Sequence, residues 1–266
     1  MKNLTMAKLG GSLITDKSKV RAHRKNVIYR LANEIHEARE ERDFSLVLGH
    51  GGGSYAHPVA KNYRTREGVI DKQSYRGIAE VHDAVSDLNG IVVDSLREAG
   101  ENAISVQPSS TAIAERGKIK RWYLKPLKTM LSYDMVPVVY GDVLVDTKKG
   151  CSIVSTEEVL GFLSKKLGSK RMIIAGTTDG VFKEDPHKNK NAEFIPEITP
   201  KNYQEIIGFI GGSAGIDVTG GMLGKINSLI SLTSHDIEVE IINGEKEDYL
   251  KRALLGERDL GTIIKA

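Results

Sequence analysis

Four short stretches of the sequence place glycines beside residues able to bind an anion: "KLGGS" (8–12), "HGGGS" (50–54), "AGTTDG" (175–180) and "DVTGGM" (217–222). Each follows an apolar or small-residue run and precedes a helix or a loop. Backbone N–H groups in such turns can point at phosphate, aided by the dipole of a following helix. One such turn is usually only the end of a strand. Four in one chain, two of them with a nearby lysine, predict an anion-binding edge.

The turns do not match the two common nucleotide-binding fingerprints. A Walker A sequence needs G-x-x-x-x-G-K-[ST], and a dinucleotide fold needs G-x-G-x-x-G after a strand, and neither pattern occurs at these turns. A nucleoside triphosphate could still be held by paired glycine turns and converging lysines. No metal-ligand spacing is found among five of the seven histidines, which are His23, His36, His82, His187 and His235. We therefore expect no metal centre built from protein ligands.

Composition narrows the class of protein. The 266 residues are 40% hydrophobic, which is ample for a large core, and the net charge is only +3 with both signs interspersed. No basic surface for nucleic acid is expected. No run approaches the ~20 apolar residues of a membrane span, and the N-terminus lacks a signal peptide. The single cysteine, Cys151, excludes an internal disulfide and is expected to be buried. We therefore expect a cytoplasmic protein without a membrane partner.

The elements that must position these turns alternate between strands and helices. Apolar runs predict strands at 3–9, 44–49, 102–108, 135–146, 171–176 and 239–244. Helical spacing predicts helices at 26–41, 75–100, 154–168 and 217–232, the third capped by Ser155 or Thr156. Residues 183–202 are polar and contain prolines, which indicates a surface loop with a short hairpin.

This alternation favours an α/β fold with an open, mainly parallel sheet sandwiched between helices. In such sheets ligands bind at the carboxyl ends of the strands, where the glycine turns lie. We expect a single domain over 1–266. A division near 145–155 is an alternative, although composition does not shift there.

Five stretches, in this order, resemble the amino acid kinase superfamily: "KLGGSLITDK", "HGGGSYAHPVA", "VPVVYGDV", "TDGVF" and "DVTGGMLGKI". The likeness extends from Lys8 to the terminal "ALLGERDLGTII" and is strongest to the archaeal-type isopentenyl phosphate kinases. Its most specific element is the glycine triplet followed by an aromatic residue, a small residue and His57. Phosphate-accepting members of the superfamily carry that histidine, whereas acylphosphate-forming members such as acetylglutamate kinase do not.

The resemblance implies transfer of a phosphoryl group from ATP, with Mg²⁺, to isopentenyl phosphate, giving isopentenyl diphosphate and ADP. Such a reaction asks the protein mainly for positioning and charge stabilisation. The acceptor is a phosphate monoester with a second pKa near ~6, so it is already anionic at neutral pH. The resemblance also implies a homodimer, with the acceptor in the half at roughly 1–150 and ATP in the half at roughly 151–266.

On the acceptor side, the resemblance implies that His57 donates a hydrogen bond to the acceptor phosphate while His50 serves structure. Gly52 and Gly53 would approach the two phosphates that are being joined. Ile78 and Val81 would line the prenyl-tail pocket, although their helical spacing is also that of any helix facing a core.

On the nucleotide side, the resemblance implies that Lys8 bridges ATP phosphate oxygens, that Lys17 stabilises the transition state and that Lys225 binds the nucleotide phosphates. Further ATP-binding residues would be Gly10, Gly11, Ser12, Gly53, Glu157, Asp179, Gly180, Gly220 and Gly221. Two stretches depart from the family pattern, with Ser155-Thr156-Glu157 for Ser-Gly-Asp and 176–180 for Thr-Asp-Val-Asp-Gly.

Two alternatives remain open from the residues alone. One is a kinase for another small phosphate or phosphonate, such as dimethylallyl phosphate or fosfomycin, because such enzymes share the histidine. The other is a domain that senses a nucleotide or phosphate without turnover, which the two altered stretches would permit. Lys8, His57 and Lys225 together favour catalysis over sensing.

Overall fold

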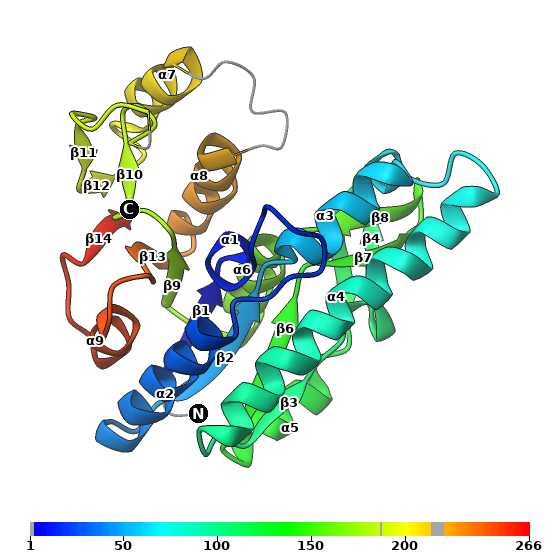
Figure 1. The fold of residues 1–266 in the computed structure, drawn as a ribbon, viewed down its shortest axis with the longest axis horizontal. Coiled ribbons are helices and arrows are strands. Elements are labelled where there is room, and N and C mark those ends of the chain that lie inside the picture. The colour runs from blue at the N-terminus through cyan, green and yellow to red at the C-terminus, as the bar shows by residue number, and fades with distance from the viewer. Residues whose placement is uncertain (1–2, 187, 214–220) are drawn as a thin grey trace.

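The computed structural model describes residues 3–186, 188–213 and 221–266, and its central feature is an eight-stranded sheet with helices on both faces (Figure 1). Neighbouring strands run parallel except β13 and β14. This confirms the predicted α/β fold. In spatial order the strands are β12 (Glu197–Ile198), β14 (Gly261–Ile264), β13 (Glu238–Asn243), β9 (Arg171–Gly176), β1 (Leu4–Leu9), β2 (Ser45–His50), β6 (Val136–Tyr140) and β3 (Ala103–Ser105).

The central strands are buried on both faces. In β1, Met6 packs into the hydrophobic cluster on one side of the sheet and Ala7 into the cluster on the other. In β2, Val47 and Leu48 divide in the same way. This is why these strands are continuous apolar runs rather than alternating ones. Lys8 breaks the run as a charged residue near the carboxyl end of β1.

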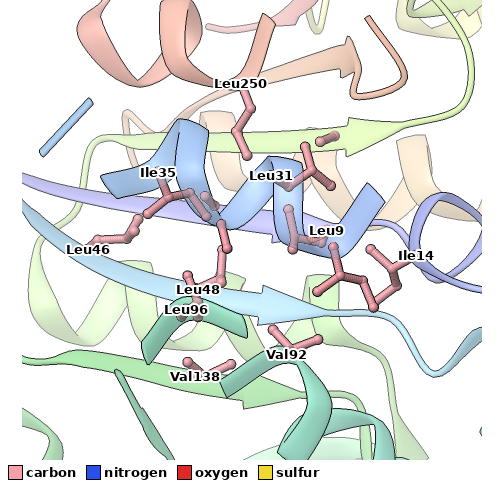
Figure 2. Packing of buried hydrophobic residues seen from close by; sticks show 14 of the residues in the cluster. Leu9, Ile14, Leu31, Ile35, Leu46, Leu48, Val92, Leu96, Val138 and Leu250 are labelled. Atoms are coloured by element: carbon pink, nitrogen blue, oxygen red, sulfur yellow. The ribbon is translucent and has the colours of Figure 1, made fainter. Parts of the chain in front are cut away.

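One face of the sheet is covered by α2 (Lys25–Glu41), α4 (Gln73–Glu98) and α9 (Tyr249–Leu255). Figure 2 shows Leu31 and Ile35 of α2 in the same packed cluster as residues of the strands. Leu96 of α4 and Leu250 of α9 belong to this cluster too. The predicted helical spacing of 26–41 therefore describes a core-facing stripe, as amphipathic helices require.

The other face is covered by α5 (Lys125–Ser132), α6 (Thr156–Leu167) and α8 (Gly221–Thr233), and α7 (Tyr203–Ser213) packs against α8. The N-cap of α6 is Ser155, one of the two predicted residues. Its side chain accepts a hydrogen bond from the amide of Glu158, and Glu158 accepts one from the amide of Ser155. This reciprocal box fixes where α6 begins.

A second, four-stranded sheet was not predicted. Its order is β5 (Lys118–Trp122), β4 (Ala112–Glu115), β7 (Asp142–Asp146) and β8 (Gly150–Val154). The prediction of one strand over 135–146 is therefore wrong, because β6 ends at Tyr140 and β7 begins in the other sheet. The break lies at Gly141, where a Cβ atom would come within 3.0 Å of the Thr156 nitrogen. The two hairpins of this sheet meet at Asp146, which accepts hydrogen bonds from the amides of Arg116 and Gly117 and from the Ser152 hydroxyl.

The short hairpin expected within residues 183–202 is present, although its first strand lies just before that stretch. It pairs β10 (Val181–Phe182) with β11 (Phe194–Ile195) in antiparallel fashion. Among the described helices, none combines the length and the apolar character needed to cross a membrane.

The carboxyl ends of the parallel strands share one edge, and the glycine turns lie along it. Gly10 follows β1 and leads into the short helix α1 (Gly11–Ile14), while Gly51 follows β2 and leads into α3 (Gly53–Asn62). Gly141 follows β6 and Gly244 follows β13. Gly176 ends β9 at the same edge, so the fold brings three of the four predicted turns together; residues 217–220 of the fourth lie outside the described residues.

Candidate active site

The first two glycine turns pack backbone against backbone. A Cβ atom on Gly11 would lie 2.5 Å from the nitrogen of Gly53, and one on Gly51 would lie 2.6 Å from the nitrogen of Gly11. Gly53 also has a φ of +48°, and a Cβ there would come within 2.1 Å of the Thr15 hydroxyl. The glycines therefore allow the turns after β1 and β2 to touch. This close approach is a structural reason for the triplet in addition to the predicted one.

The amides of these turns divide into used and available donors. The N–H of Gly10 donates to the Ala175 carbonyl at 2.8 Å, and that of Gly51 donates to Leu9 at 2.9 Å. Gly10 thus ties the edge together, and its amide is not free for phosphate. Gly52 is the N-cap of α3 and Gly53 its first residue. First-turn amides have no acceptor within their own helix, and the helix dipole there attracts anions.

Lys8 and Glu157 form an ion pair at the centre of this edge. The Lys8 Nζ lies 2.5 Å from Glu157 Oε1, and the two residues are only 5% and 8% exposed. Burial raises the pKa of Glu157, but the charge of Lys8, their hydrogen bond and the charge of Lys225 together hold it below its ordinary value. Glu157 is therefore a carboxylate that fixes the position of Lys8.

His57 lies on α3 with an exposed side chain, surrounded by charges from other elements. The atoms around its ring withhold solvent, and this desolvation lowers the pKa of His57. The charges of Arg66, Lys17 and Lys8 lower that pKa further, against an opposing effect of Glu157. Four charged residues from other parts of the chain thus act on His57, and three of them, Lys8, Lys17 and Glu157, are among the site residues that the resemblance implied.

His50, at the other end of the same turn, lies in the core. Its side chain is fully buried, Asn89 donates to its Nε2 at 3.1 Å, and its Nδ1 lies 3.3 Å from the Gly51 carbonyl oxygen. These partners are satisfied together by a neutral ring protonated on Nδ1. Burial lowers the pKa of His50 to about 4. The structural role expected for His50 agrees with this environment.

Lys225 comes from α8, which covers the face of the sheet opposite to α2, α4 and α9. It lies in the second turn of α8, which begins at Gly221, and its charge lowers the pKa of Glu157. Because Glu157 is bonded to Lys8, the three groups belong to one electrostatic cluster. Gly220, predicted beside this helix, lies outside the described residues.

The turn after β9 is organised differently. Asp179 accepts a hydrogen bond from Asn243 at 2.8 Å and lies 2.8 Å from the Lys246 Nζ. The hydrogen bond from Lys246 is the main reason that the pKa of Asp179 is lowered. Gly180 has a φ of +136° beneath Thr262. These two predicted residues join β9 to the end of β13, and no recorded interaction connects them to Lys8 or His57 within the described part of the chain.

An apolar cavity of about 230 Å³ is lined by residues of α4, β7, β8 and the 3-10 turn at Pro108–Ser110. Of the two residues proposed for a tail pocket, Ile78 lines this cavity, whereas Val81 is 2% exposed and packs in a hydrophobic cluster. Ala60 of α3 belongs to the same cluster as the lining residues Val143 and Cys151, so α3 packs near the cavity through Ala60. The other lining residues are Ala79, His82, Ser109, Val143, Val145 and Cys151.

Two other lining residues add a titratable group and a thiol to the cavity wall. His82, one helical turn after Ile78, lines the cavity and hydrogen-bonds the buried Asp142 through its Nδ1 at 3.1 Å. That bond is the main reason that the pKa of His82 is raised. Cys151 is buried as predicted, and it also contributes to the cavity wall.

Thr156, one of the departures from the family pattern, points into the protein. Its hydroxyl donates to the His50 carbonyl at 2.7 Å and accepts from the Gly141 amide at 2.9 Å. The threonine therefore links α6 to the ends of β2 and β6. Its side chain is 3% exposed and is occupied by these contacts.

The donor set of the site suits an anion rather than a bare cation. Among the described residues, no three His, Cys, Asp or Glu side chains cluster as metal ligands. Glu157 is engaged by Lys8. Mg²⁺ is commonly held by substrate phosphates and water with few protein carboxylates, so this arrangement fits an ion that arrives on ATP.

The chain is similar to known proteins in both sequence and structure. Residues 3–243 match the profile of the Amino acid kinase family. The chain belongs to the amino acid kinase family. The match spans both glycine turns, the Lys8–Glu157 pair and Lys225, so the electrostatic cluster lies wholly within the family domain.

Members of the amino acid kinase family resemble the chain over nearly its full length. The isopentenyl phosphate kinase of Methanothermobacter thermautotrophicus is 35% identical over 268 residues, covering 98% of both chains. That of Methanocaldococcus jannaschii is 33% identical with the same coverage. A solved structure of an isopentenyl phosphate kinase shares a TM-score of 0.85 at 33% identity and covers 98% of this chain and 100% of its own.

Arg66 is the charged residue of this amino acid kinase site that the sequence did not reveal. It lies in the 3-10 turn η1 (Thr65–Glu67) after α3, and its charge acts on His57. In the sequence it stands in "YRTREG", where nothing distinguishes it from other exposed arginines. Only the return of the chain after α3 brings it to the site.

Proposed function

We propose that this protein transfers the γ-phosphoryl group of ATP directly to the phosphate of isopentenyl phosphate, giving isopentenyl diphosphate and ADP. The observation that carries the proposal is the convergence of Lys8, Lys17, Lys225 and Arg66 around Glu157 and His57. Near-full-length similarity to isopentenyl phosphate kinases supports the choice of acceptor.

The chemical demand explains why the site is cationic. An oxygen of the acceptor phosphate attacks the γ-phosphorus, the bond from that phosphorus to the bridging oxygen breaks, and ADP leaves. The acceptor is already an anion at neutral pH, so no strong general base is needed. Repulsion between two anions is the main barrier. Positioned cations and amides reduce it without covalent chemistry.

The acceptor half of the proposal is built on α3. His57 donates a hydrogen bond to the acceptor phosphate, and the amides of Gly52 and Gly53 at the start of the helix face the phosphates being joined. The apolar tail enters the cavity that Ile78 lines. The phosphate thus contacts α3 and the tail contacts α4. The need for both contacts distinguishes prenyl phosphates from inorganic phosphate.

The nucleotide half uses the lysines. Lys8, held by Glu157, contacts the transferring phosphoryl group, Lys17 stabilises its charge in the transition state, and Lys225 binds the nucleotide phosphates. The remaining residues proposed for the nucleotide are Gly11, Ser12, Gly53, Asp179, Gly180, Gly220 and Gly221; Gly10 is not among them, because its amide donates to the Ala175 carbonyl. We place acceptor binding at roughly 1–150 and ATP binding at roughly 151–266.

MgATP is the donor substrate in this proposal. Phosphate oxygens hold the ion, and it neutralises charge on the leaving ADP. A cytoplasmic homodimer is the assembly that the family resemblance implies for the working enzyme.

A panel of acceptors tests the function. Purified protein with MgATP should release ADP with isopentenyl phosphate and more slowly with dimethylallyl phosphate, and should not act on fosfomycin or acetylglutamate. Lys17→Met should lower kcat, whereas Lys19→Met, which changes an exposed lysine on the same loop, should not. If fosfomycin were the only compound phosphorylated, isopentenyl phosphate would not be the acceptor. ATP binding without transfer to any acceptor would make the protein a sensor.

A further inference from the structure

The loop that carries Lys17 is a small closed structure. It connects α1 to α2, and its ends are joined by a β-bridge between Thr15 and His23. Within it, the amide of Asp16 donates to the Ala22 carbonyl at 2.8 Å. Lys17 therefore projects from a hairpin-like tip rather than from a free strand of chain. In Figure 1 this loop extends from α1 toward α3 and α4.

The base of the loop is attached to the helix of His57. The amide of Ser54 donates to the Thr15 hydroxyl at 3.0 Å, and the amide of Arg21 donates to the Ser54 carbonyl at 3.2 Å. Further along, His23 and the Tyr55 hydroxyl lie 3.0 Å apart. Ser54 and His57 share α3, so these bonds set the loop beside that histidine. The charge of Lys17 lowers the pKa of His57, in agreement with this placement.

The side chain of Arg21 joins the other flank of the loop to α4. Its Nη1 donates to Asp87 at 2.7 Å and its Nη2 to Asp83 at 2.9 Å. Asp83 and Asp87 are four residues apart and lie on one face of the helix. A planar guanidinium bridging two carboxylates fixes its own orientation better than a single point charge does.

Two further features indicate that this contact has a role beyond surface charge. Arg21 has a φ of +52°, a left-handed conformation that is uncommon for residues other than glycine. Exposed ion pairs add only about 0–1 kcal/mol to stability, so folding alone is a weak reason to hold that conformation. Asp83 directly follows His82, which lines the tail cavity. Arg21 therefore links the helix of the cavity to the loop of Lys17.

We propose that Arg21 is a positioning residue for phosphoryl transfer: its bonds to Asp83 and Asp87 hold the loop of residues 15–24 so that Lys17 faces the phosphate next to His57. This inference rests on the proposed function. It assigns to Arg21 no contact with substrate. Its effect on the reaction passes through Lys17 alone.

The first test separates kcat from KM. Arg21→Met should lower kcat for isopentenyl phosphate by about 10- to 100-fold, because a catalytic group displaced by ~1 Å loses that much. KM for either substrate should change by less than about 3-fold, since neither is bound by Arg21. An unchanged kcat would overturn the proposal.

The second test asks whether Arg21 acts through Lys17. In a Lys17→Met background, adding Arg21→Met should lower kcat by less than about 2-fold, because residues that act as a unit are not additive. An undiminished loss in that background would show that Arg21 supports the fold or another group, and would overturn the proposal.

Control variants separate positioning from stability. Arg116 has a φ of 51° at the turn between β4 and β5, so Arg116→Met removes another left-handed arginine and should leave kcat unchanged. Arg21→Lys should restore part of the activity, because an ammonium can still meet one carboxylate. If Arg21→Met fails to fold, Asp83→Ala with Asp87→Ala removes the acceptors of the same bonds and should give the same kcat loss.

A readout independent of turnover completes the design. Trypsin cleaves after Lys17 and Lys19, both exposed on the loop. Arg21→Met should accelerate cleavage there relative to wild type and Arg116→Met, and equal rates in all three would overturn the loop-holding role. If wild type fails to phosphorylate isopentenyl phosphate, the proposed function fails, but faster cleavage in Arg21→Met would still establish the clamp.

Discussion

The two histidines that flank the glycine triplet, His50 and His57, lie in contrasting environments. His50 ends β2 with its ring fully buried and both nitrogens beside partners, Asn89 and the Gly51 carbonyl. His57, seven residues later, has an exposed side chain among charges from Lys8, Lys17 and Arg66.

The difference teaches that the environment, and not the residue type, assigns the role. Burial lowers the pKa of His50 to about 4, so it is a neutral part of the core. Desolvation and the neighbouring cations Arg66, Lys17 and Lys8 lower the pKa of His57, so its surroundings favour a negative charge beside it. One histidine holds the turn in place, and the other offers a donor to whatever anion the turn accepts.

The largest expected effect is the loss of catalysis when the His57 side chain is removed. His57→Ala should lower kcat/KM for isopentenyl phosphate by about 10²–10³-fold, as removal of one donor to a developing charge does. The free energy of unfolding should change by less than about 1 kcal/mol because the side chain is exposed. Steady-state kinetics and urea unfolding measure the two quantities.

The control for this variant is His235→Ala, another exposed histidine, which lies after α8. It should leave both quantities unchanged. A His57→Ala enzyme with nearly full activity would remove the histidine from the proposed mechanism.

The next effect is on stability. His50→Ala should lower the free energy of unfolding by about 2–3 kcal/mol, because it leaves a cavity and removes the partner of Asn89. Among molecules that remain folded, kcat should stay within about 5-fold of wild type, since His50 is placed outside the chemistry. Thermal or urea unfolding and assays at low temperature measure this. A loss of kcat as large as that of His57→Ala would erase the distinction between the two residues.

An effect of similar size tests the role of His50 through pH. Its pKa falls from 6.5 to about 4 on folding, so between these values the unfolded chain binds a proton that the folded chain excludes. Its contribution to stability is therefore complete above pH 6.5 and declines by up to about 3 kcal/mol as the pH falls through 4. His50→Gln should show a shallower decline in urea unfolding between pH 7 and 4. Parallel curves would contradict the buried neutral ring.

The smallest effect concerns the charge on His57. The lowered pKa leaves it largely neutral at pH 7, and a bound phosphate dianion should raise that pKa. Binding of isopentenyl phosphate should therefore take up a fraction of a proton, measured by calorimetry in two buffers of different ionisation enthalpy. His57→Ala should lose this uptake, and equal uptake in both proteins would place the proton elsewhere.

The sequence predicted the fold where a local pattern and a buried face coincide. The apolar runs at 3–9 and 44–49 became β1 and β2 because both faces of these strands are covered. The run at 135–146 has the same appearance, yet it divides between two sheets at Gly141. The packing of Gly141 on Thr156 decides that break, and a contact between residues so far apart leaves no local signal.

The residues of the site also divide into those that the sequence revealed and those that it did not. Lys8 was predicted from its place beside a glycine turn and from the family resemblance, and the fold adds its buried ion pair with Glu157. Arg66 and Arg21 had no such signal, since each is an ordinary arginine in a polar loop. Only the fold shows that these loops approach α3 and α4.

Phosphorus NMR of the complete reaction tests the central claim most directly. With MgATP and isopentenyl phosphate, the wild-type protein should convert the γ-phosphorus signal of ATP into the paired signals of a new diphosphate in equal amount to the ADP formed. His50→Ala should do the same, and His57→Ala should not within the same time. Release of ADP with inorganic phosphate and no new diphosphate would contradict the account.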